Sequence, residues 1–238
     1  MKNWHVNLLT LFPDMFPGSL GQSLSGRALE KGVWSYACVD IRDFGTGTHK
    51  NVDDTPFGGG AGMVMRADII DAALHSIPKA HQGRVIYMSP RGKPLTQKLV
   101  QELSAEQALT ILCGRYEGID QRVLDAHDIE EISIGDYVLS GGEPAAMILM
   151  DACIRLLKGV MGNNTTPDEE SFSNGLLEYP HYTRPAKWTD NAGATHTIPE
   201  VLTSGHHKNI QEWRLEQSES LTQQRRPDLW ECYKKSKK

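Results

Sequence analysis

Five short apolar runs alternate with segments of helical character, and this alternation limits the fold more than any other feature of the chain. The apolar runs span residues 6–12, 36–44, 84–89, 109–114 and 129–135. Helical patterns cover residues 21–31, 67–76, 96–103, 120–126 and 144–157, and Gly32 is well placed to end the first of them. Strands that alternate with helices favour a parallel sheet covered on both faces. The sequence therefore predicts an α/β domain.

The composition of the chain changes near Gly159. Residues 161–174 are rich in glycine, asparagine, threonine, proline and acids, which is typical of a flexible linker. After the linker, helical patterns at 199–203, 207–224 and 227–234 follow one another without a strand pattern. We expect an α/β domain at 1–160, a linker at 161–174 and a small all-helical domain at 175–238.

Charge and cysteine content exclude several classes of protein. A formal net charge of −5 argues against a protein that coats nucleic acid through its overall positive charge. It still allows a local basic patch. The four cysteines lie far apart and form no Cys-x-x-Cys pair, so they suggest neither a disulfide framework nor a zinc site. No apolar stretch approaches the roughly 20 residues that span a bilayer. We therefore expect a soluble cytoplasmic protein, with no metal ligands assigned.

Glycine-rich turns follow the third, fourth and fifth predicted strands. They read "SPRGKPL", "CGRYEGIDQR" and "SIGDYVLSGGEPAAM", and a further glycine-rich stretch, "TPFGGGAGMVM", occupies residues 55–65. Neither phosphate-binding fingerprint is met: Met63 stands where the dinucleotide pattern needs glycine, and Pro94 follows Gly92-Lys93 where the P-loop needs serine or threonine. Each glycine alone is compatible with a tight turn. The three late turns together point to a ligand, because open α/β sheets bind ligands at the carboxyl ends of their strands.

The turn at residues 133–147 contains no lysine or arginine. Such a turn offers backbone hydrogen bonds without a fixed cation, which suits a polar ligand that lacks phosphate. S-adenosylmethionine fits this description, because it joins an adenosine and an amino acid through a sulfonium cation that a lysine cradle would repel. A nucleotide-dependent enzyme stays open as an alternative at this point.

Five motifs carry a resemblance to a known family. The segments "SPRG", "CGRYEGIDQR", "SIGDYVLSGGE", "GLLEYPHYTRP" and "LTSGHHKNIQEWR" together resemble the bacterial tRNA (guanine-N1)-methyltransferases, which methylate the guanosine beside the anticodon, at tRNA position 37. The likeness extends from "LLTLFPDMF" to "RRPDLW". It implies a SPOUT-class fold with a deep trefoil knot, an obligate homodimer with the active site at the subunit interface, S-adenosylmethionine as methyl donor, and a dependence on magnesium.

The resemblance also implies a set of cofactor-binding residues in and around the three late turns. They are Tyr87, Ser89, Pro90, Gly92, Gly114, Tyr116, Glu117, Gly118, Ser133, Ile134, Gly135, Tyr137, Leu139, Gly141 and Gly142.

Methylation at N1 of guanine needs a base to remove the N1 proton and a donor to stabilise the charge that grows on O6. Members of the family use an aspartate just before "SF" and an arginine on the helix after the last turn. The matching residues here are Glu170, which is one methylene longer than aspartate, and Arg155. Asp168 or Glu169 takes the role of base if the register differs. Pro144 lies one position earlier than the usual proline; it suits a first helical turn and could alter the edge of the methionine pocket.

Contacts with tRNA are expected from basic residues of the C-terminal part. The candidates are Arg184, His207, Lys208, Arg214, Arg225 and Arg226, with tRNA as the partner. Two alternatives share the same fold: a related RNA methyltransferase with another target atom, and a non-catalytic RNA-binding relative.

Overall fold

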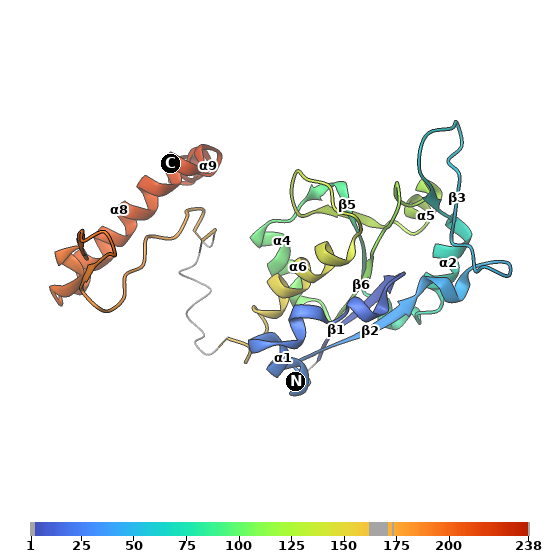
Figure 1. Cartoon of the computed structure of the whole chain (residues 1–238), viewed down its shortest axis with the longest axis horizontal. Helices are drawn as coiled ribbons and strands as arrows, with labels where there is room; N and C mark the ends of the chain where they lie inside the picture. Colours follow the sequence, from blue (N-terminus) through green and yellow to red (C-terminus); the bar gives the residue numbers. More distant parts are fainter. Residues whose placement is uncertain (1–2, 162–170, 173, 238) are drawn as a thin grey trace. The chain divides into compact units, whose positions relative to one another are not determined.

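A computed structural model describes residues 3–161, 171–172 and 174–237. The chain divides into two compact units, Met1–Gly162 and Asn163–Lys238, and each is described here by itself. The first unit contains the sheet, and the second contains the C-terminal helices (Figure 1).

A five-stranded parallel sheet forms the centre of the first unit. Its strands are β1 (Trp4–Thr10), β2 (Trp34–Asp40), β5 (Arg84–Pro94), β6 (Ala108–Leu112) and β7 (Glu130–Ser133). They lie in the order β2-β1-β6-β5-β7, and every pairing is parallel. The prediction of a parallel α/β fold is confirmed, and each strand overlaps one of the five predicted runs.

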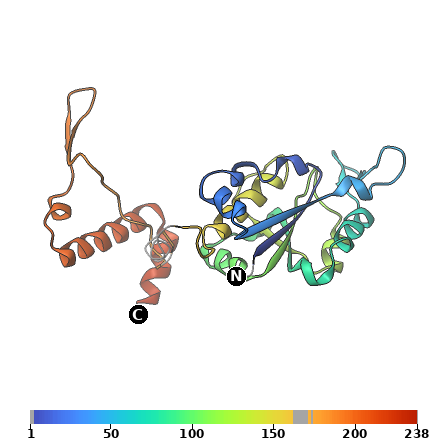
Figure 2. The ribbon, with the colours of Figure 1, turned by 90° about the horizontal axis from the view of Figure 1, so that it is seen from below.

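Helices cover both faces of this sheet (Figures 1 and 2). Neighbouring residues of β1 point to opposite faces, so Leu8 joins one hydrophobic cluster and Leu9 the other. The Leu8 cluster includes side chains of α1 (Ser23–Glu30), α4 (Gln97–Ala105) and α6 (Glu143–Ile154). The Leu9 cluster includes side chains of α2 (Ala67–His75) and α5 (Gln121–Ala126). A single turn, α3 (Lys79–Gln82), leads into β5, and short 3-10 helices occupy Pro13–Met15, Gly18–Gly21 and Ile41–Phe44.

The glycine-rich stretch at residues 55–65 lies in a small hairpin. Strand β3 (Asp53–Asp54) pairs antiparallel with β4 (Val64–Met65), and the glycines lie between them. Phe57 beside them is almost fully exposed. This stretch is therefore a hairpin connection and not a turn between a strand and a helix.

The second unit contains two strands that the sequence did not predict. Strands β8 (Lys187–Thr189) and β9 (Thr195–Thr197) form an antiparallel hairpin, seen as a narrow loop in Figure 2. The expectation of an all-helical domain is wrong in this respect. The strands have no buried face and hence no apolar alternation, and the Asp190 carboxylate fixes their turn by accepting hydrogen bonds from Ala192 and Ala194 N–H at 2.9 Å.

Helices follow this hairpin, as the sequence predicted. They are the 3-10 helix η4 (Glu200–Thr203), α8 (His207–Arg225) and α9 (Pro227–Ser236). Helices α8 and α9 contact each other, and the Tyr233 hydroxyl on α9 donates a hydrogen bond to Glu219 on α8 at 2.9 Å. Among the described residues, no helix has the length and apolar character needed to cross a membrane.

The cysteines differ in burial, and this predicts their reactivity. Cys113 and Cys153 are buried, Cys38 is half-buried and Cys232 is exposed. Burial raises the pKa of the Cys153 thiol to about 12 and that of Cys113 well above its usual value, which suppresses the reactive thiolate. At pH 8 we expect one thiol to react rapidly with a disulfide reagent in the native protein, and Cys113 and Cys153 to react only after unfolding. The Cys232→Ser variant should lose the rapid phase; its persistence in that variant would contradict the assignment.

Candidate active site

The middle of β5 and the two glycine-rich loops that follow β6 and β7 converge on one cavity. The cavity has a volume of about 190 Å³ and is lined by residues 87–90 of β5, the loop after β6, the end of β7 and the loop between β7 and α6. All the residues predicted to bind the cofactor line it, with the exception of Gly92. The structure thus brings fourteen of the fifteen predicted residues together, although their role as ligands stays a prediction.

Gly92 lies where two backbones pass close to each other. A Cβ atom added at this position would lie 2.4 Å from the backbone nitrogen of Ile132, so only glycine fits without a shift of the β7 backbone. The pairing of β5 with β7 also shifts register between Met88 and Lys93. Gly92 therefore supports the packing of the cavity wall and does not line the cavity itself.

Backbone hydrogen bonds join the cavity loops to one another. The Gly142 N–H donates to the Gly114 carbonyl at 2.9 Å, and the Leu95 N–H donates to the Ser133 carbonyl at 2.8 Å. A Cβ added to Gly142 would lie 2.8 Å from Cys113 Cα, so the start of α6 lies directly against the end of β6. The loops hold the cavity walls together through main-chain contacts that a sequence pattern does not reveal.

A buried ion pair lies behind the cavity, and sequence reasoning missed it. Glu143, the first residue of α6, is fully buried, and its carboxylate lies 2.9 Å from the guanidinium of Arg115. The Thr10 hydroxyl donates a hydrogen bond to the same carboxylate at 2.7 Å. Arg115 also donates to the Ser140 carbonyl at 3.2 Å and stacks 4.3 Å from the centre of the Phe12 ring. Arg115 thereby ties the loop after β7 to the ends of β1 and β6.

This pair sets the electrostatics of the cavity. Among the described residues that line the cavity, only Arg115 and Glu117 are charged. The Arg115 charge is offset by Glu143, so the cavity presents no uncompensated cation from a lysine or arginine. The 133–147 turn contributes no lysine or arginine to the wall, and the Arg115 that the loop after β6 contributes is paired with Glu143.

Arg155 does not line the cavity. It is the C-cap residue of α6, half-buried, whereas the cavity lies at the opposite, N-terminal end of that helix. Twelve helical residues rise about 18 Å, at 1.5 Å per residue. Within one chain, the structure therefore separates Arg155 from the predicted cofactor residues. Glu170, Asp168 and Glu169 lie outside the described residues.

Pro144 lies in the first turn of α6, as the sequence predicted. The missing N–H of proline costs nothing at this position, because the first N–H groups of a helix have no partner within it. Pro144 is half-buried and is not among the residues that line the cavity, whereas Ala145 is.

The chain matches one protein family over most of its length. Residues 4–232 match the family described as tRNA (Guanine-1)-methyltransferase TrmD. The chain belongs to this family. Three curated relatives bear the name tRNA (guanine-N(1)-)-methyltransferase. The relative from Rhodospirillum rubrum is 59% identical over 95% of this chain and 92% of its own length. The relative from Mesorhizobium japonicum is 58% identical over 94% and 95%, and the one from Brucella ovis is 55% identical over 99% and 95%.

The basic residues predicted to contact tRNA all lie in the second unit, in different surroundings. Arg184, His207, Lys208 and Arg225 are exposed. Arg214 is half-buried, with its guanidinium 4.7 Å from the centre of the Tyr179 ring. Arg226 makes two hydrogen bonds to Asp228, at 2.9 and 2.6 Å, across the junction of α8 and α9. Of these residues, Arg226 pairs with Asp228, and the Lys208 ammonium lies 3.8 Å from the Glu212 carboxylate. Their contact with tRNA stays a prediction.

Proposed function

We propose that this chain transfers a methyl group from S-adenosylmethionine to N1 of the guanosine 3′ to the anticodon, at position 37 of tRNA. The match to the tRNA (guanine-1)-methyltransferase family over residues 4–232 carries this proposal. The cavity supports it, because fourteen residues that the resemblance assigns to the cofactor line one pocket.

The residues present fit S-adenosylmethionine chemically. The cavity walls combine backbone groups of the glycine turns with tyrosine, leucine and valine side chains, which suits a ligand with both polar and apolar parts. The only arginine in the wall is paired with a buried glutamate, so the sulfonium meets no uncompensated arginine or lysine. When bound, the cofactor supplies an electrophilic methyl carbon next to that sulfonium.

Two side chains are proposed to act on the guanine, one as the base at N1 and one as a hydrogen-bond donor to O6. Glu170 accepts the N1 proton as N1 forms its bond to the methyl carbon, and the carbon–sulfur bond breaks with its electron pair going to sulfur. Arg155 stabilises the negative charge that moves to O6. Asp168 and Glu169 are the alternatives to Glu170 as base.

The proposed catalytic unit is a homodimer with its active site between subunits. The separation of about 18 Å between the two ends of α6 supports this, because Arg155 of one chain lies far from that chain's cavity. We propose a SPOUT-class trefoil knot formed by the three loops, supported by the close passage of Gly92 against β7 and of Gly142 against β6. The enzyme is proposed to act in the cytoplasm and to use magnesium, whose ligands stay unassigned.

The second unit is proposed to bind tRNA through phosphate contacts, while the target base is read as a splayed, unpaired nucleotide. The exposed Arg184, His207, Lys208 and Arg225 are the main candidates. Arg214 and Arg226 are proposed as further contacts.

Methyl transfer to anticodon stem-loops tests the function directly. We expect labelled methyl from S-adenosylmethionine to reach a stem-loop with guanosine at position 37, and digestion to yield 1-methylguanosine. A stem-loop with adenosine at that position should stay unlabelled. Label on a ribose or on another base atom would instead identify a relative with a different target, and tRNA binding without transfer would identify a non-catalytic protein.

A further inference from the structure

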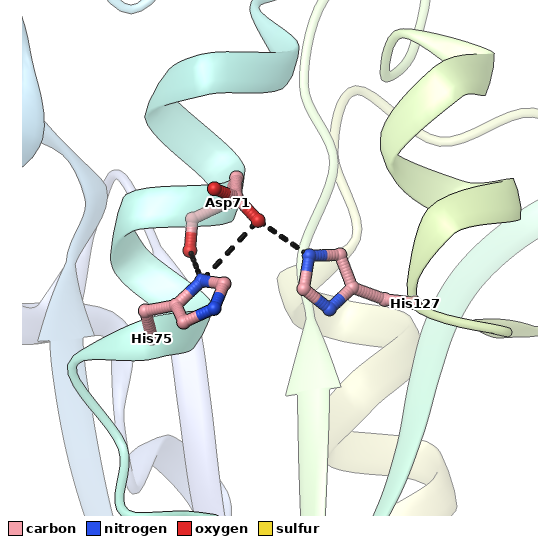
Figure 3. Close-up of side chains that lie close together, drawn as sticks. All are labelled: Asp71, His75 and His127. Carbon is pink, nitrogen blue, oxygen red and sulfur yellow. Dashed lines mark hydrogen bonds and ion pairs between the residues drawn. The ribbon is translucent and has the colours of Figure 1, made fainter.

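Three metal-binding side chains meet at the junction of α2 and α5, away from the cavity. Asp71 and His75 come from α2, and His127 is the C-cap residue of α5 (Figure 3). Their potential ligand atoms all lie within 4.8 Å of one another. We propose that Asp71, His75 and His127 form a binding site for a divalent transition metal ion, with Zn²⁺ as the best match.

The two helices place these ligands by ordinary geometry. Asp71 and His75 are four residues apart, so they lie on the same face of α2. His127 reaches this face because α2 and α5 pack through the buried side chains of Ile70, Leu74 and Val123 in one hydrophobic cluster. The core therefore holds the third ligand in position before any ion binds, and this preorganisation favours binding.

The distances suit an ion with short bonds. His127 Nε2 lies 2.5 Å from Asp71 Oδ1, and His75 Nδ1 lies 3.2 Å from the same oxygen. Tetrahedral ligands at 2.0–2.1 Å from zinc lie about 3.3 Å from one another. His75 Nδ1 also lies 2.9 Å from the Asp71 backbone carbonyl (Figure 3), so rotation of this imidazole out of that hydrogen bond would accompany metal binding.

The exposure of the cluster leaves room for the remaining coordination. The side chain of His75 is 69% exposed and that of Asp71 49%, whereas His127 is held more deeply at 21%. An ion could enter from solvent and keep water as its fourth ligand. Two imidazoles and one carboxylate favour zinc or its neighbours, whereas magnesium prefers oxygen ligands only. The cluster is therefore distinct from the magnesium dependence that the resemblance implies.

An ion at this site would connect two parts of the first unit. The loop that lines the cavity continues directly into α5, and the Asp120 side chain caps that helix by accepting from Arg122 N–H at 2.9 Å. Zinc would tie the far end of α5 to α2 and so restrain the element that follows the cavity wall. The sequence did not reveal the site, because His127 is 52 residues beyond His75.

Zinc titration of the full chain against a chromophoric chelator tests the proposal. We expect one tight equivalent of Zn²⁺, a rise in the thermal unfolding midpoint with Zn²⁺ but not Mg²⁺, and a tetrahedral visible spectrum with Co²⁺. The His127→Ala and His75→Ala variants should each bind zinc at least about 10–100-fold more weakly, the loss that even outer-shell partners of metal sites can cause.

The His49→Ala variant is the matched control, because it removes an exposed imidazole from a loop far along the chain from the cluster. It should bind zinc as the unchanged protein does. If the unchanged protein binds no zinc, or if both His75→Ala and His127→Ala bind it undiminished, the proposal is overturned and the cluster is only a hydrogen-bonded contact between helices. His75 is exposed at the end of α2, so its variant should fold even if His127→Ala does not.

Discussion

Replacing Glu170 by glutamine should lower the rate of methyl transfer by about 10²–10⁴-fold, the usual contribution of a general base. Glutamine keeps the size and most of the polarity of glutamate, but its amide cannot accept the N1 proton. The expected result is a fall in the single-turnover rate constant for methyl transfer, measured with labelled S-adenosylmethionine and the guanosine-37 stem-loop. Cofactor affinity, measured separately by calorimetry, should stay unchanged, because the cavity residues are untouched.

The two acidic residues before Glu170 provide matched control variants. Asp168→Asn and Glu169→Gln each remove one charge from the same segment, and each should keep activity within a few-fold of the unchanged enzyme. If instead Asp168→Asn or Glu169→Gln has the large effect, the base belongs to that position and the register is shifted. Equal activity in all three variants would show that this segment contains no base at all.

Replacing Glu143 by alanine should destabilise the protein by about 3–5 kcal/mol, because it leaves the Arg115 guanidinium without its buried partner. The Arg115 side chain is only 18% exposed, so water compensates little for the lost carboxylate. The free energy of unfolding from urea denaturation measures the effect. Affinity for S-adenosylmethionine should fall as well, since Arg115 then no longer holds the loop at Ser140.

Two further variants separate the unpaired charge from the loss of packing. Thr10→Val removes the hydrogen bond to the carboxylate, worth about 1.5–3 kcal/mol, and also the acceptor of the Phe12 N–H at 2.9 Å. The double variant Glu143→Met/Arg115→Met removes both charges together, and replacement of a buried pair by apolar residues is often close to neutral. We expect the double variant to be more stable than Glu143→Ala. A double variant as unstable as the single one would show that packing around α6, and not the charge, dominates.

The sheet and its helices could be predicted because their signals are local. Apolar runs and helical periodicity located all five parallel strands and the helices α1, α2, α4, α5 and α6. The prediction of a turn directly after residue 89 is wrong, because β5 continues through that segment to Pro94, with a register shift against β7. The ends of the strands were predicted less accurately. The predicted strand at 36–44 stops at Asp40, because the Asp40 carboxylate accepts from Arg42 N–H at 2.9 Å and begins a 3-10 turn. Such a side-chain cap competes with the strand and leaves no apolar pattern.

The cavity could be predicted in outline, because parallel strands bring their carboxyl ends to one edge. The pair between Arg115 and Glu143 could not, since Arg115 lies in the loop after β6 and Glu143 at the start of α6, and nothing in either segment marks the other. The same holds for Asp71, His75 and His127. The exposed hairpin of β8 and β9 was not predicted for another reason. Strands without a buried face need no apolar residues, so their sequence carries no alternating pattern.

The length of α6 has a consequence for mixtures of two inactive proteins. The N-terminal end of the helix adjoins the cavity, and Arg155 lies at its C-terminal end. In the proposed dimer, each active site combines the cavity of one chain with Arg155 of the other. A change in the cavity and a change at Arg155 of the same chain therefore disable different active sites. An Arg155→Ala chain keeps its cavity, and a Glu117→Lys chain keeps Arg155 but places a cation in the wall of the proposed cofactor cavity. Refolded together, they should complement each other. Half of the random dimers would be hybrids with one intact site of two, which restores about a quarter of full activity. A mixture as inactive as either parent would mean that each chain works alone.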